Sequence, residues 1–269
     1  MSATAAGTPD LLAAIVAAAR RMTDVRRDSV PESEMERRAQ QRHPDGAAFV
    51  RALRDGAAPR VIAECKRRSP SKGILRENYR AAEHAASYAA AGAAAISVLT
   101  EPTFFDGSLD DLAAVRRAVT TPLLRKDFIV ERYQVLEAAA NGADAILLIV
   151  GGLTREALAR RLADARACGL AALFEVHDAD ELAVAIDAGA DVIGVNSRNL
   201  RTLSVDPAVH EQVAARIPRH TVAVAESGLR EHADVERLAR AGYHAFLVGE
   251  RLIAEADPGA ALRRLRGAP

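Results

Sequence analysis

Residues 142–150 read GADAILLIV: one glycine, three short residues, then five large aliphatic side chains in a row. Glycine readily adopts the left-handed backbone conformation that commonly ends a helix. A continuous apolar run of this length is typical of a parallel strand that is covered on both faces. The stretch therefore predicts a helix end followed directly by a buried strand.

The same arrangement of a glycine and an apolar run occurs five times along the chain. Three further apolar runs have no such glycine before them, and they bring the number of candidate strands to eight. The glycines and their runs are Gly92 before AAAISVL, Gly142 before ADAILLIV, Gly169 before LAALFEV, Gly189 before ADVIGV and Gly242 before YHAFLVG; the other three runs are Arg60–Cys65, Pro122–Arg125 and Thr221–Ala225.

The stretches between the candidate strands are long enough for one helix each, and their apolar residues lie three and four positions apart. Eight alternating strand and helix units in roughly 210 residues match a (β/α)8 barrel. A doubly wound open sheet is the alternative, but it usually has a GxGxxG turn after its first strand, where this chain has KRRSP. We predict an α/β fold, a (β/α)8 TIM barrel over residues 60–269 with an N-terminal helical extension over residues 1–59, in a single domain.

The N-terminal extension contains two predicted helices, near Pro9–Arg21 and Pro31–Gln40. It is too short to be a separate catalytic domain. Its composition leaves two placements open, one across the bottom of the barrel and one over its top.

Composition argues against several classes of function. The 36 Lys and Arg residues balance the 36 Asp and Glu residues, so no overall field favours nucleic acid or a membrane surface. The two cysteines, Cys65 and Cys168, and the seven scattered histidines lack the spacing of a disulfide framework or a metal site. Leu11–Ala19 is too short to span a bilayer and follows Asp10, not a basic segment. We expect a cytoplasmic protein without a metal, as a monomer or a weak homodimer.

Polar residues stand at the carboxyl ends of the candidate strands, which meet at one mouth in a (β/α)8 barrel. A single charged residue there is more often part of a structural ion pair, but several that converge on one mouth indicate a site. These strand-end residues are Glu64, Lys66, Glu101, Lys126, Asp127, Glu175, His177, Asn196, Glu226, Ser227, Gly249 and Glu250.

Spacing and residue type predict acid–base chemistry at this mouth. Glu64 and Lys66 are two apart on a strand, so they share one face as a carboxylate–ammonium pair while Cys65 faces the helices. Lys126 ends its strand, where partial desolvation suits a lysine to act as a general acid. Glu175 lies within LFEVHD, an apolar setting that we expect to raise its pKa toward neutrality.

Glycines at the last two strand ends predict a phosphate site. Gly228 follows Glu226 and Ser227, and Gly249 precedes Glu250. Barrels commonly bind phosphate at these two ends through backbone N–H groups. Turn glycines alone would give the same pattern, but its presence in both loops favours phosphate.

Six stretches resemble the indole-3-glycerol phosphate synthase family, and the resemblance runs from about residue 10 to the C-terminus. Their length, their order and their places at consecutive strand ends make the resemblance specific. The stretches are IAECKRRSPSKG from Ile62, SVLTEPTFFDGSLDDL from Ser97, LLRKDFIVERYQVLEAAANGADAILLIV from Leu123, FEVHDADEL from Phe174, IGVNSRNLRTLSVD from Ile193 and VAESGL from Val224.

The resemblance implies a carboxy-lyase of tryptophan biosynthesis that needs no cofactor or metal. Its substrate would be 1-(2-carboxyphenylamino)-1-deoxyribulose 5-phosphate, which ring closure, decarboxylation and dehydration convert to indole-3-glycerol phosphate. By resemblance, Lys126 is the general acid at the ribulose carbonyl, Glu175 is the base in the dehydration, and Glu64 with Lys66 orients the substrate. The resemblance also implies polar contacts from Asn196, Arg198, Ser69, Glu226 and Ser227, phosphate contacts from Gly228 and Gly249 beside Glu250, and a mobile loop over Ser69–Gly73.

Two other functions fit a phosphate-binding barrel. The first is another enzyme such as phosphoribosylanthranilate isomerase, which needs a Cys/Asp acid–base pair, and the outward direction expected for Cys65 argues against it. The second is a barrel that binds a phosphorylated ligand without turnover, which would be expected to lack Lys126, Glu175 or Glu64. Arg251, after Glu250, departs from the commonest family pattern and would either contact phosphate or turn to solvent.

Overall fold

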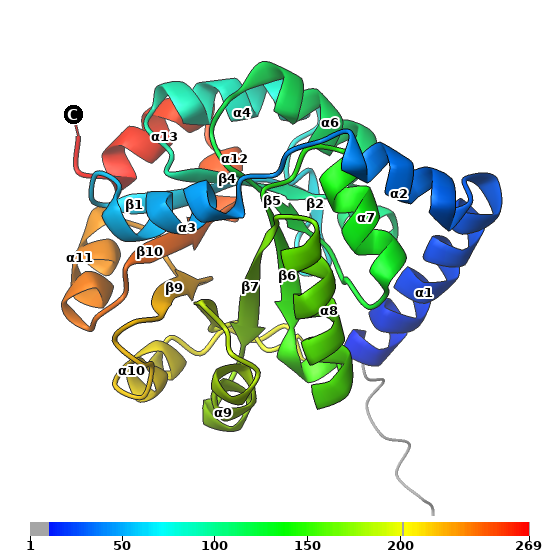
Figure 1. Cartoon of the computed structure of the whole chain (residues 1–269). Helices are drawn as coiled ribbons and strands as arrows, with labels where there is room; N and C mark the ends of the chain where they lie inside the picture. Colours follow the sequence, from blue (N-terminus) through cyan, green and yellow to red (C-terminus); the bar gives the residue numbers. More distant parts are fainter. Residues whose placement is uncertain (1–10, 201, 269) are drawn as a thin grey trace, which may run out of the picture.

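Eight parallel strands close into a barrel in the computed structural model, which describes residues 11–200 and 202–268 (Figure 1). The strands are β1 (Arg60–Cys65), β4 (Ala95–Leu99), β5 (Leu123–Lys126), β6 (Ala145–Ile149), β7 (Ala171–Val176), β8 (Val192–Asn196), β9 (Val222–Glu226) and β10 (Ala245–Val248). Neighbours in sequence pair with each other, and β1 closes the barrel by pairing with both β4 and β10. The predicted (β/α)8 fold is confirmed, and so are the eight predicted strands.

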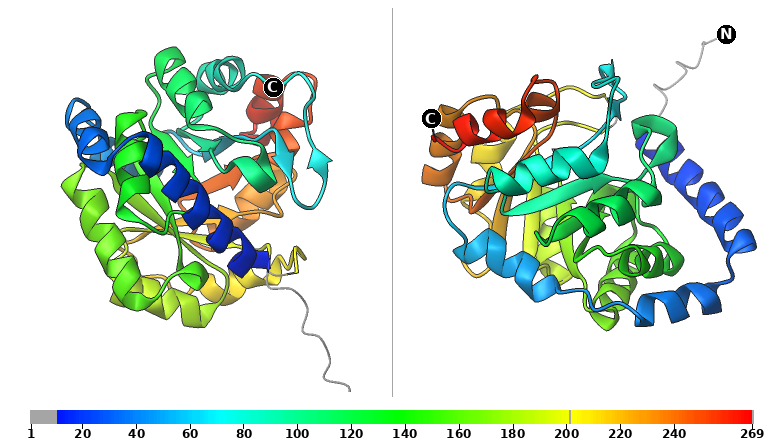
Figure 2. Two further views of the ribbon diagram at one scale, coloured as in Figure 1. Left: turned by 90° about the vertical axis from the view of Figure 1, so that its right-hand side faces the viewer. Right: turned by 90° about the horizontal axis from the view of Figure 1, so that it is seen from above.

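Helices cover the outside of the barrel between successive strands (Figures 1 and 2). The five glycines that precede strands all have φ between 75° and 105°, so the predicted left-handed helix ends are confirmed. The helices after β1 are α4 (Ala81–Ala90), α6 (Leu109–Ala118), α7 (Arg132–Ala140), α8 (Arg155–Ala167), α9 (Ala179–Asp187), α10 (Ala208–Ala214), α11 (His232–Arg240) and α13 (Pro258–Leu265).

Short elements that the sequence did not predict lie in the loops at the mouth. The first loop contains a small antiparallel pair of strands, and the loops after β4, β6 and β10 each contain a short helix. These are β2 (Arg68–Ser69), β3 (Gly73–Ile74), α5 (Pro102–Phe105), the 3-10 helix η1 (Val150–Gly152) and α12 (Glu250–Ile253).

Successive residues of each strand alternate between the barrel interior and the surrounding helices. On β1, Ile62 packs inside the barrel, whereas Val61, Ala63 and Cys65 pack in the outer apolar layer. The Sγ atom of Cys65 lies 3.8 Å from the carbonyl oxygen of Ala81 in α4, so the predicted outward direction of this thiol is confirmed.

Three helices precede the barrel: α1 (Leu11–Ser29), α2 (Glu32–Gln40) and α3 (Gly46–Asp55). The expected start of the first helix, Pro9, lies outside the described residues together with Asp10. The helix continues past its predicted end at Arg21, and polar contacts with α7 stabilise its last turns. A pattern of apolar residues in the sequence does not show such contacts. The third helix was not predicted.

The extension takes both placements that the sequence left open. Phe49 and Leu53 of α3 are fully buried and pack with interior side chains of the strands, so α3 closes the bottom of the barrel. Leu11 and Ile15 of α1 line a hollow at the opposite end, among residues that follow the strands. Figure 2 shows α1 running along the side of the barrel between these two levels.

A buried ionic network fastens α1 to the strand that carries Lys126. Arg26 of α1 makes two contacts of 2.6 and 3.0 Å with the carboxylate of Glu137 in α7. Arg125 of β5 lies 3.3 Å from the same carboxylate and 2.8 Å from that of Asp127, and both Arg125 and Glu137 are 1% exposed. Since two cations face two carboxylates, the network is neutral as a whole, which is the condition for burying such charges.

Removing one member of this network should strongly destabilise the fold. Glu137→Ala leaves the two cations Arg26 and Arg125 with Asp127 as the one remaining carboxylate of the network, so we expect the free energy of unfolding to fall by about 3–5 kcal/mol. Urea denaturation followed by circular dichroism measures it. Asp187→Ala, which breaks an exposed pair with Arg155, is the control and should change little. Equal effects of the two substitutions would contradict the importance of the network.

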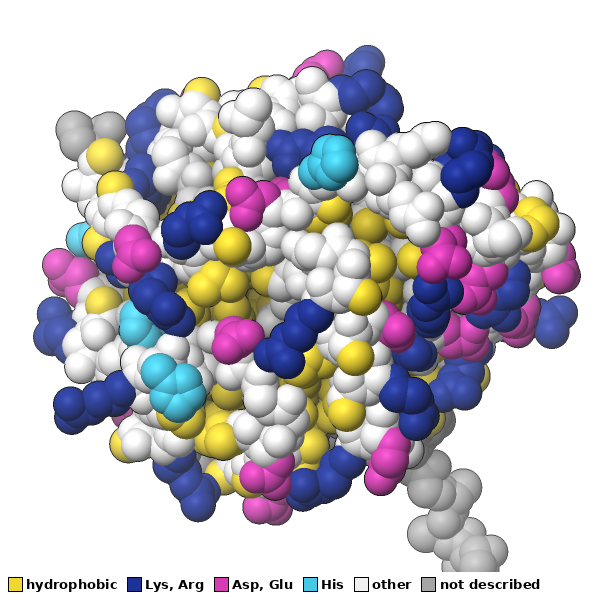
Figure 3. All heavy atoms as spheres, viewed as in Figure 1, with side chains coloured by type: hydrophobic (Ala, Val, Ile, Leu, Met, Phe, Trp, Pro, Cys, Tyr) yellow, Lys and Arg dark blue, Asp and Glu magenta, His cyan; other side chains and the backbone are white. Residues whose placement is uncertain are grey.

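None of the helices in the described part of the chain is both long and apolar enough to cross a membrane. On the face seen in Figure 3, Lys and Arg side chains lie interspersed with Asp and Glu side chains.

Candidate active site

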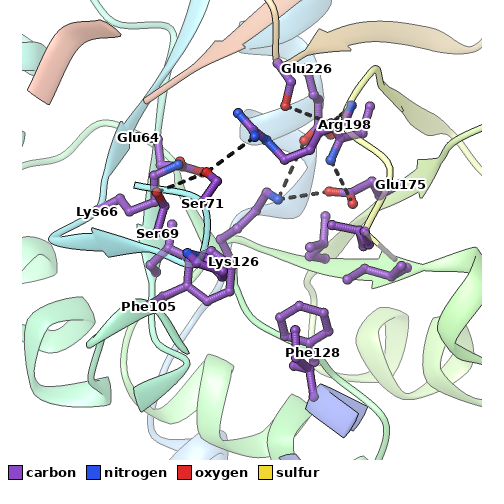
Figure 4. Close-up of a pocket in the computed structure, with 18 of the residues that line it drawn as sticks. Glu64, Lys66, Ser69, Ser71, Phe105, Lys126, Phe128, Glu175, Arg198 and Glu226 are labelled. Atoms are coloured by element: carbon purple, nitrogen blue, oxygen red, sulfur yellow. Dashed lines mark hydrogen bonds and ion pairs between the residues drawn. The ribbon is translucent and has the colours of Figure 1, made fainter. Parts of the chain in front are cut away.

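Two adjoining hollows lie at the carboxyl ends of the strands, and the twelve residues predicted to be catalytic or to bind substrate line them. Figure 4 shows the first of the two hollows. The first hollow is deeper in the barrel, and the second lies over the ends of β9 and β10. Lining the first are Glu64, Lys66, Ser69, Lys126, Glu175, Asn196, Arg198, Glu226, Ser227 and Glu250; the second shares Glu64, Lys66, Arg198, Ser227 and Glu250 and adds Gly228 and Gly249.

Lys126 lies at the centre of the first hollow (Figure 4). Its Nζ atom is 2.9 Å from Oε2 of Glu175 and 3.6 Å from Oε2 of Glu226. Burial lowers the pKa of Lys126, but the carboxyl groups of Glu175, Glu226 and Glu64 raise it by more, so the pKa stands above its ordinary value. Lys126 is therefore an ammonium group at neutral pH, as a proton donor must be.

The expectation that the pKa of Glu175 is raised toward neutrality is wrong. Burial does raise it, but Lys126 and His177 lower it by more, so the pKa lies below its ordinary value. The side-chain amide of Asn196 also donates to Oε1 of Glu175 over 3.1 Å. Glu175 is therefore a carboxylate. The apolar residues beside it in LFEV suggested a raised pKa, but the nearby cations Lys126 and His177 outweigh the effect of burial.

Glu226 is the carboxyl group of this site that holds a proton near neutrality. Burial, with further contributions from Glu175 and Glu64 against the opposing effect of Lys126, raises the pKa of Glu226 to about 8. Its Oε1 atom has no hydrogen-bond partner among the described residues. Gly194 on β8 leaves the space for it, because a side chain at that position would collide with Oε1.

The remaining strand-end side chains form two local sets. The Nζ atom of Lys66 lies 2.7 Å from Oε1 of Glu64, which is the pair expected from their spacing. Ser227 donates to Oδ1 of Asn196 over 2.8 Å, so Asn196 links the end of β9 to Glu175 on β7. Ser227 has a φ of 64°, a left-handed conformation that turns the chain sharply at the mouth.

Cations gather around Glu250 between the first loop and the second hollow. The guanidinium of Arg198 lies 3.4 Å from Glu250 and 3.4 Å from the hydroxyl of Ser71, and Nζ of Lys72 lies 3.2 Å from Glu250. Burial raises the pKa of Glu250, but Lys66, Arg198 and Lys72 lower it by more. The carboxylate of Glu250, just after β10, thus binds Lys72 of the loop that follows β1.

A family model described as indole-3-glycerol phosphate synthase matches residues 12–265 of the chain. The chain belongs to the indole-3-glycerol phosphate synthase family. Indole-3-glycerol phosphate synthase 2 of Streptomyces coelicolor is 48% identical over 257 residues, which are 96% of this chain and 99% of that protein. The synthase of Sulfurimonas denitrificans is 51% identical over 207 residues, 77% of this chain and 79% of that protein.

Solved structures support the fold alone. A 3-hexulose-6-phosphate synthase superimposes with a TM-score of 0.61 and 18% identity, covering 77% of this chain and 98% of its own. A thiamine phosphate pyrophosphorylase from Pyrococcus furiosus gives a TM-score of 0.60 and 17% identity, covering 81% of this chain and 96% of its own.

Two of the strand-end residues, Glu101 and Asp127, and also Arg251 in α12 bind neighbouring parts of the chain. The carboxylate of Glu101 caps α5 by accepting from three backbone N–H groups, and that of Asp127 accepts from Thr100 and Arg125. Arg251, whose direction the sequence left open, bonds to Glu255 and to the carbonyl oxygen of Arg230. Its guanidinium is therefore engaged at the outer rim of the second hollow.

An apolar wall of the first hollow was missed in the sequence. It lies in the same hollow as Lys126 and Glu175 and comes from α1, β4 and its following loop, the loop after β5, β6 and the loop after β8. The stripe of apolar residues at helical spacing in α1 was visible, but nothing local indicated that its first turn reaches the mouth. The wall consists of Leu11, Ile15, Leu99, Phe105, Phe128, Leu147, Ile149, Leu200 and Leu203.

Within the described ranges, no group of three or more His, Cys, Asp or Glu side chains is arranged to hold a metal ion. Two carboxylates of the first hollow pair with lysines, Glu64 with Lys66 and Glu175 with Lys126.

Proposed function

We propose that this chain carries out the reaction of the indole-3-glycerol phosphate synthase family with Lys126 as the proton donor of ring closure. In that reaction 1-(2-carboxyphenylamino)-1-deoxyribulose 5-phosphate becomes indole-3-glycerol phosphate, CO2 and water. The observation that carries the proposal is the ammonium of Lys126, held between two buried carboxyl groups at the centre of the mouth. An aromatic carbon that attacks the ribulose carbonyl needs a proton donor at the carbonyl oxygen.

Proton balance assigns the other two carboxyl groups. Ring closure takes one proton at the carbonyl oxygen, from Lys126, and the carboxylate then leaves as CO2. Dehydration then removes a proton from the ring CH2 group beside the nitrogen and adds a proton to the hydroxyl group that departs as water from the former carbonyl carbon. Glu175, a carboxylate, accepts the proton of the CH2 group, and Glu226, which holds a proton near neutrality, donates the proton to the departing hydroxyl group. Exchange with solvent restores the two carboxyl groups, and Lys126 takes from solvent the one proton that the overall reaction consumes.

The two hollows suit different chemical groups of the substrate. The apolar wall with Phe105 and Phe128 suits the carboxyphenyl ring, and the backbone N–H groups at Gly228 and Gly249 suit the phosphate. Glu64 and Lys66 line both hollows, so they are placed to orient the ribulose chain between them.

The direct test of function supplies the carboxyphenylamino-deoxyribulose phosphate to the purified chain and follows indole fluorescence. We expect steady formation of the fluorescent product without an added metal or cofactor. No signal from a folded chain would overturn the proposal.

Arg198 provides a prediction about substrate binding. Its guanidinium already pairs with Glu250 in the second hollow, so we propose that it contacts an anionic group of the substrate. Charge-assisted hydrogen bonds contribute about 1.5–3 kcal/mol, so Arg198→Met should raise KM by roughly 10- to 100-fold with a smaller change in kcat. Arg251→Met is the matched control, and its KM should change by less. The same KM change in both variants would argue against a specific role for Arg198.

The two alternative functions have less support. Phosphoribosylanthranilate isomerase chemistry would need a cysteine in the mouth, and Cys65 packs against α4 instead. A barrel that only binds a phosphorylated ligand would not need an ammonium held between two carboxyl groups.

We further propose that the small phosphorylated substrate is the only ligand the site requires. We also propose that a monomer or weak homodimer suffices, because one chain supplies all twelve residues assigned to the site.

A further inference from the structure

We propose that His177 is a positioning residue, an imidazolium that holds Glu175 in place as a carboxylate while Lys126 gives up its proton. The proposal rests on the function proposed above for Glu175 and Lys126. His177 itself lines neither hollow, so it acts through Glu175 and not on the substrate.

Both ring nitrogens of His177 face carboxylates. Nε2 lies 3.3 Å from Oε1 of Glu175, and Nδ1 lies 3.0 Å from Oε2 of Glu181. A neutral imidazole has one protonated nitrogen, so it would turn a lone pair toward one of these carboxylates. The imidazolium instead hydrogen-bonds Glu181 through Nδ1 and faces Glu175 through Nε2 as an ion pair without hydrogen-bond geometry. The ring is mostly buried, with 13% of the side chain exposed, so water screens these interactions little.

Glu181 is itself fixed in the position that charges the ring. It stands in the first turn of α9, where its Oε2 atom also accepts from the backbone N–H of His177 over 2.8 Å. Gly151 in η1 leaves the space for the other oxygen, because a side chain there would collide with Oε1 of Glu181. Gly151 has no positive φ in the structure, so the need for glycine at this position is a need for space.

The charged and polar groups around Glu175 come from the ends of β1, β5, β7, β8 and β9, whereas β6, which also pairs with β7, ends there in the apolar Ile149. Two of them are cations in direct contact, one neutral amide donates to it, and the acidic neighbours lie beyond. In order these are Lys126 of β5, His177 after β7, Asn196 of β8, Glu226 of β9, and the Glu64–Lys66 pair of β1.

The role of His177 follows from what happens to Lys126 during turnover. When Lys126 transfers its proton to the carbonyl oxygen, it becomes neutral, and Glu175 loses its nearest cation. Without another cation, a buried carboxylate would take up a proton or move. His177 stays charged through this step because Glu181 supports it from the other side, so Glu175 remains a base for the dehydration.

The electrostatics of the ring agree with this geometry. Burial lowers the pKa of His177, but Glu175 and Glu181 raise it by more, to about 10. His210 is the internal contrast, since its Nε2 atom faces the carbonyl oxygens of Val195 and Glu226 and burial keeps its pKa below the ordinary value.

The first test needs no enzymatic activity. Nitrogen-15 NMR of the histidine rings in the intact chain, between pH 6 and 8.5, distinguishes doubly from singly protonated imidazole. We expect both nitrogens of His177 to stay protonated over this range while His210 stays neutral. A His177 ring that is neutral at pH 7.5 would overturn the proposal, whether or not the chain has synthase activity.

The second test is the pH dependence of kcat/KM. His177→Gln removes the charge, so the acidic limb of the profile should move up by about one pH unit and kcat should fall by about tenfold, with KM within about twofold. His177→Lys restores a cation and should move the limb back. Gly151→Ala, which displaces Glu181 without changing any charge, should give a smaller shift in the same direction.

His220→Gln, at a position on the outer surface remote from the mouth, is the matched control and should leave the profile unchanged. A His177→Gln profile that superimposes on that of the unaltered chain would overturn the proposal, provided that thermal denaturation shows both to be folded. Loss of activity in the unaltered chain would instead count against the proposed function alone.

Discussion

Replacing Lys126 by arginine should lower kcat by about a thousandfold while the substrate still binds. General acid catalysis contributes roughly 10²- to 10⁴-fold, and guanidinium keeps its proton at any working pH, so arginine preserves the charge without the chemistry. The positive charge beside Glu175 and Glu226 is retained, which separates proton donation from electrostatic balance. Steady-state indole fluorescence gives kcat, and the KM should change by less than tenfold.

Lys126→Met tests whether the positive charge of Lys126 stabilises the site. It removes charge as well as proton, so it should be at least as inactive as Lys126→Arg and also less stable, because two buried carboxyl groups lose their cation. Lys72→Met, on the exposed first loop, is the control for loss of a lysine near the site. A kcat for Lys126→Arg near that of the unaltered chain would contradict the role of Lys126 as the donor.

Replacing Glu226 by glutamine should lower kcat by about a hundredfold and change the pH profile. The pKa of Glu226 is raised to about 8 by burial, so the group is protonated below this pH and loses its proton above it. A donor that titrates in this way gives kcat/KM a decline as the pH rises through about 8. Glutamine cannot titrate, so that decline should be absent from the residual activity of Glu226→Gln.

Glutamine has the shape and hydrogen-bonding capacity of the protonated carboxyl group, so the fold should be kept. Circular dichroism and thermal denaturation check this before the kinetics are compared. The role given to Glu226 would be wrong if the unaltered chain showed no decline above pH 8, or if Glu226→Gln kept the same decline.

The barrel could be predicted from local signals. Each glycine before an apolar run marks a helix end by its backbone conformation, and a continuous apolar run marks a strand covered on both faces. The helices Gly46–Asp55 and Pro102–Phe105 could not be predicted this way. The first buries only two large apolar side chains, those of Phe49 and Leu53, and the second forms because the carboxylate of Glu101 caps it.

The positions of the site residues followed from the strand ends, but their protonation did not. Glu175 and Glu226 occupy equivalent places at the ends of strands, and the sequence favoured Glu175 as the carboxyl group with the raised pKa. The structure reverses this because the cations His177 and Lys126 both lie close to Glu175. Among the described residues, Lys126 is the one cation that forms an ion pair with Glu226. Such a difference depends on distances between strands, which a sequence pattern does not contain.

The most direct test of the proposed mechanism measures CO2 release and indole formation separately in a single turnover. In the proposed mechanism Lys126 acts before decarboxylation and Glu226 after it, so the two variants should stop at different points. We predict that Lys126→Arg releases no CO2 and forms no indole, whereas Glu226→Gln releases about one CO2 per active site with slow or no indole. Rapid CO2 release by Lys126→Arg, or parallel loss of both products in Glu226→Gln, would contradict it.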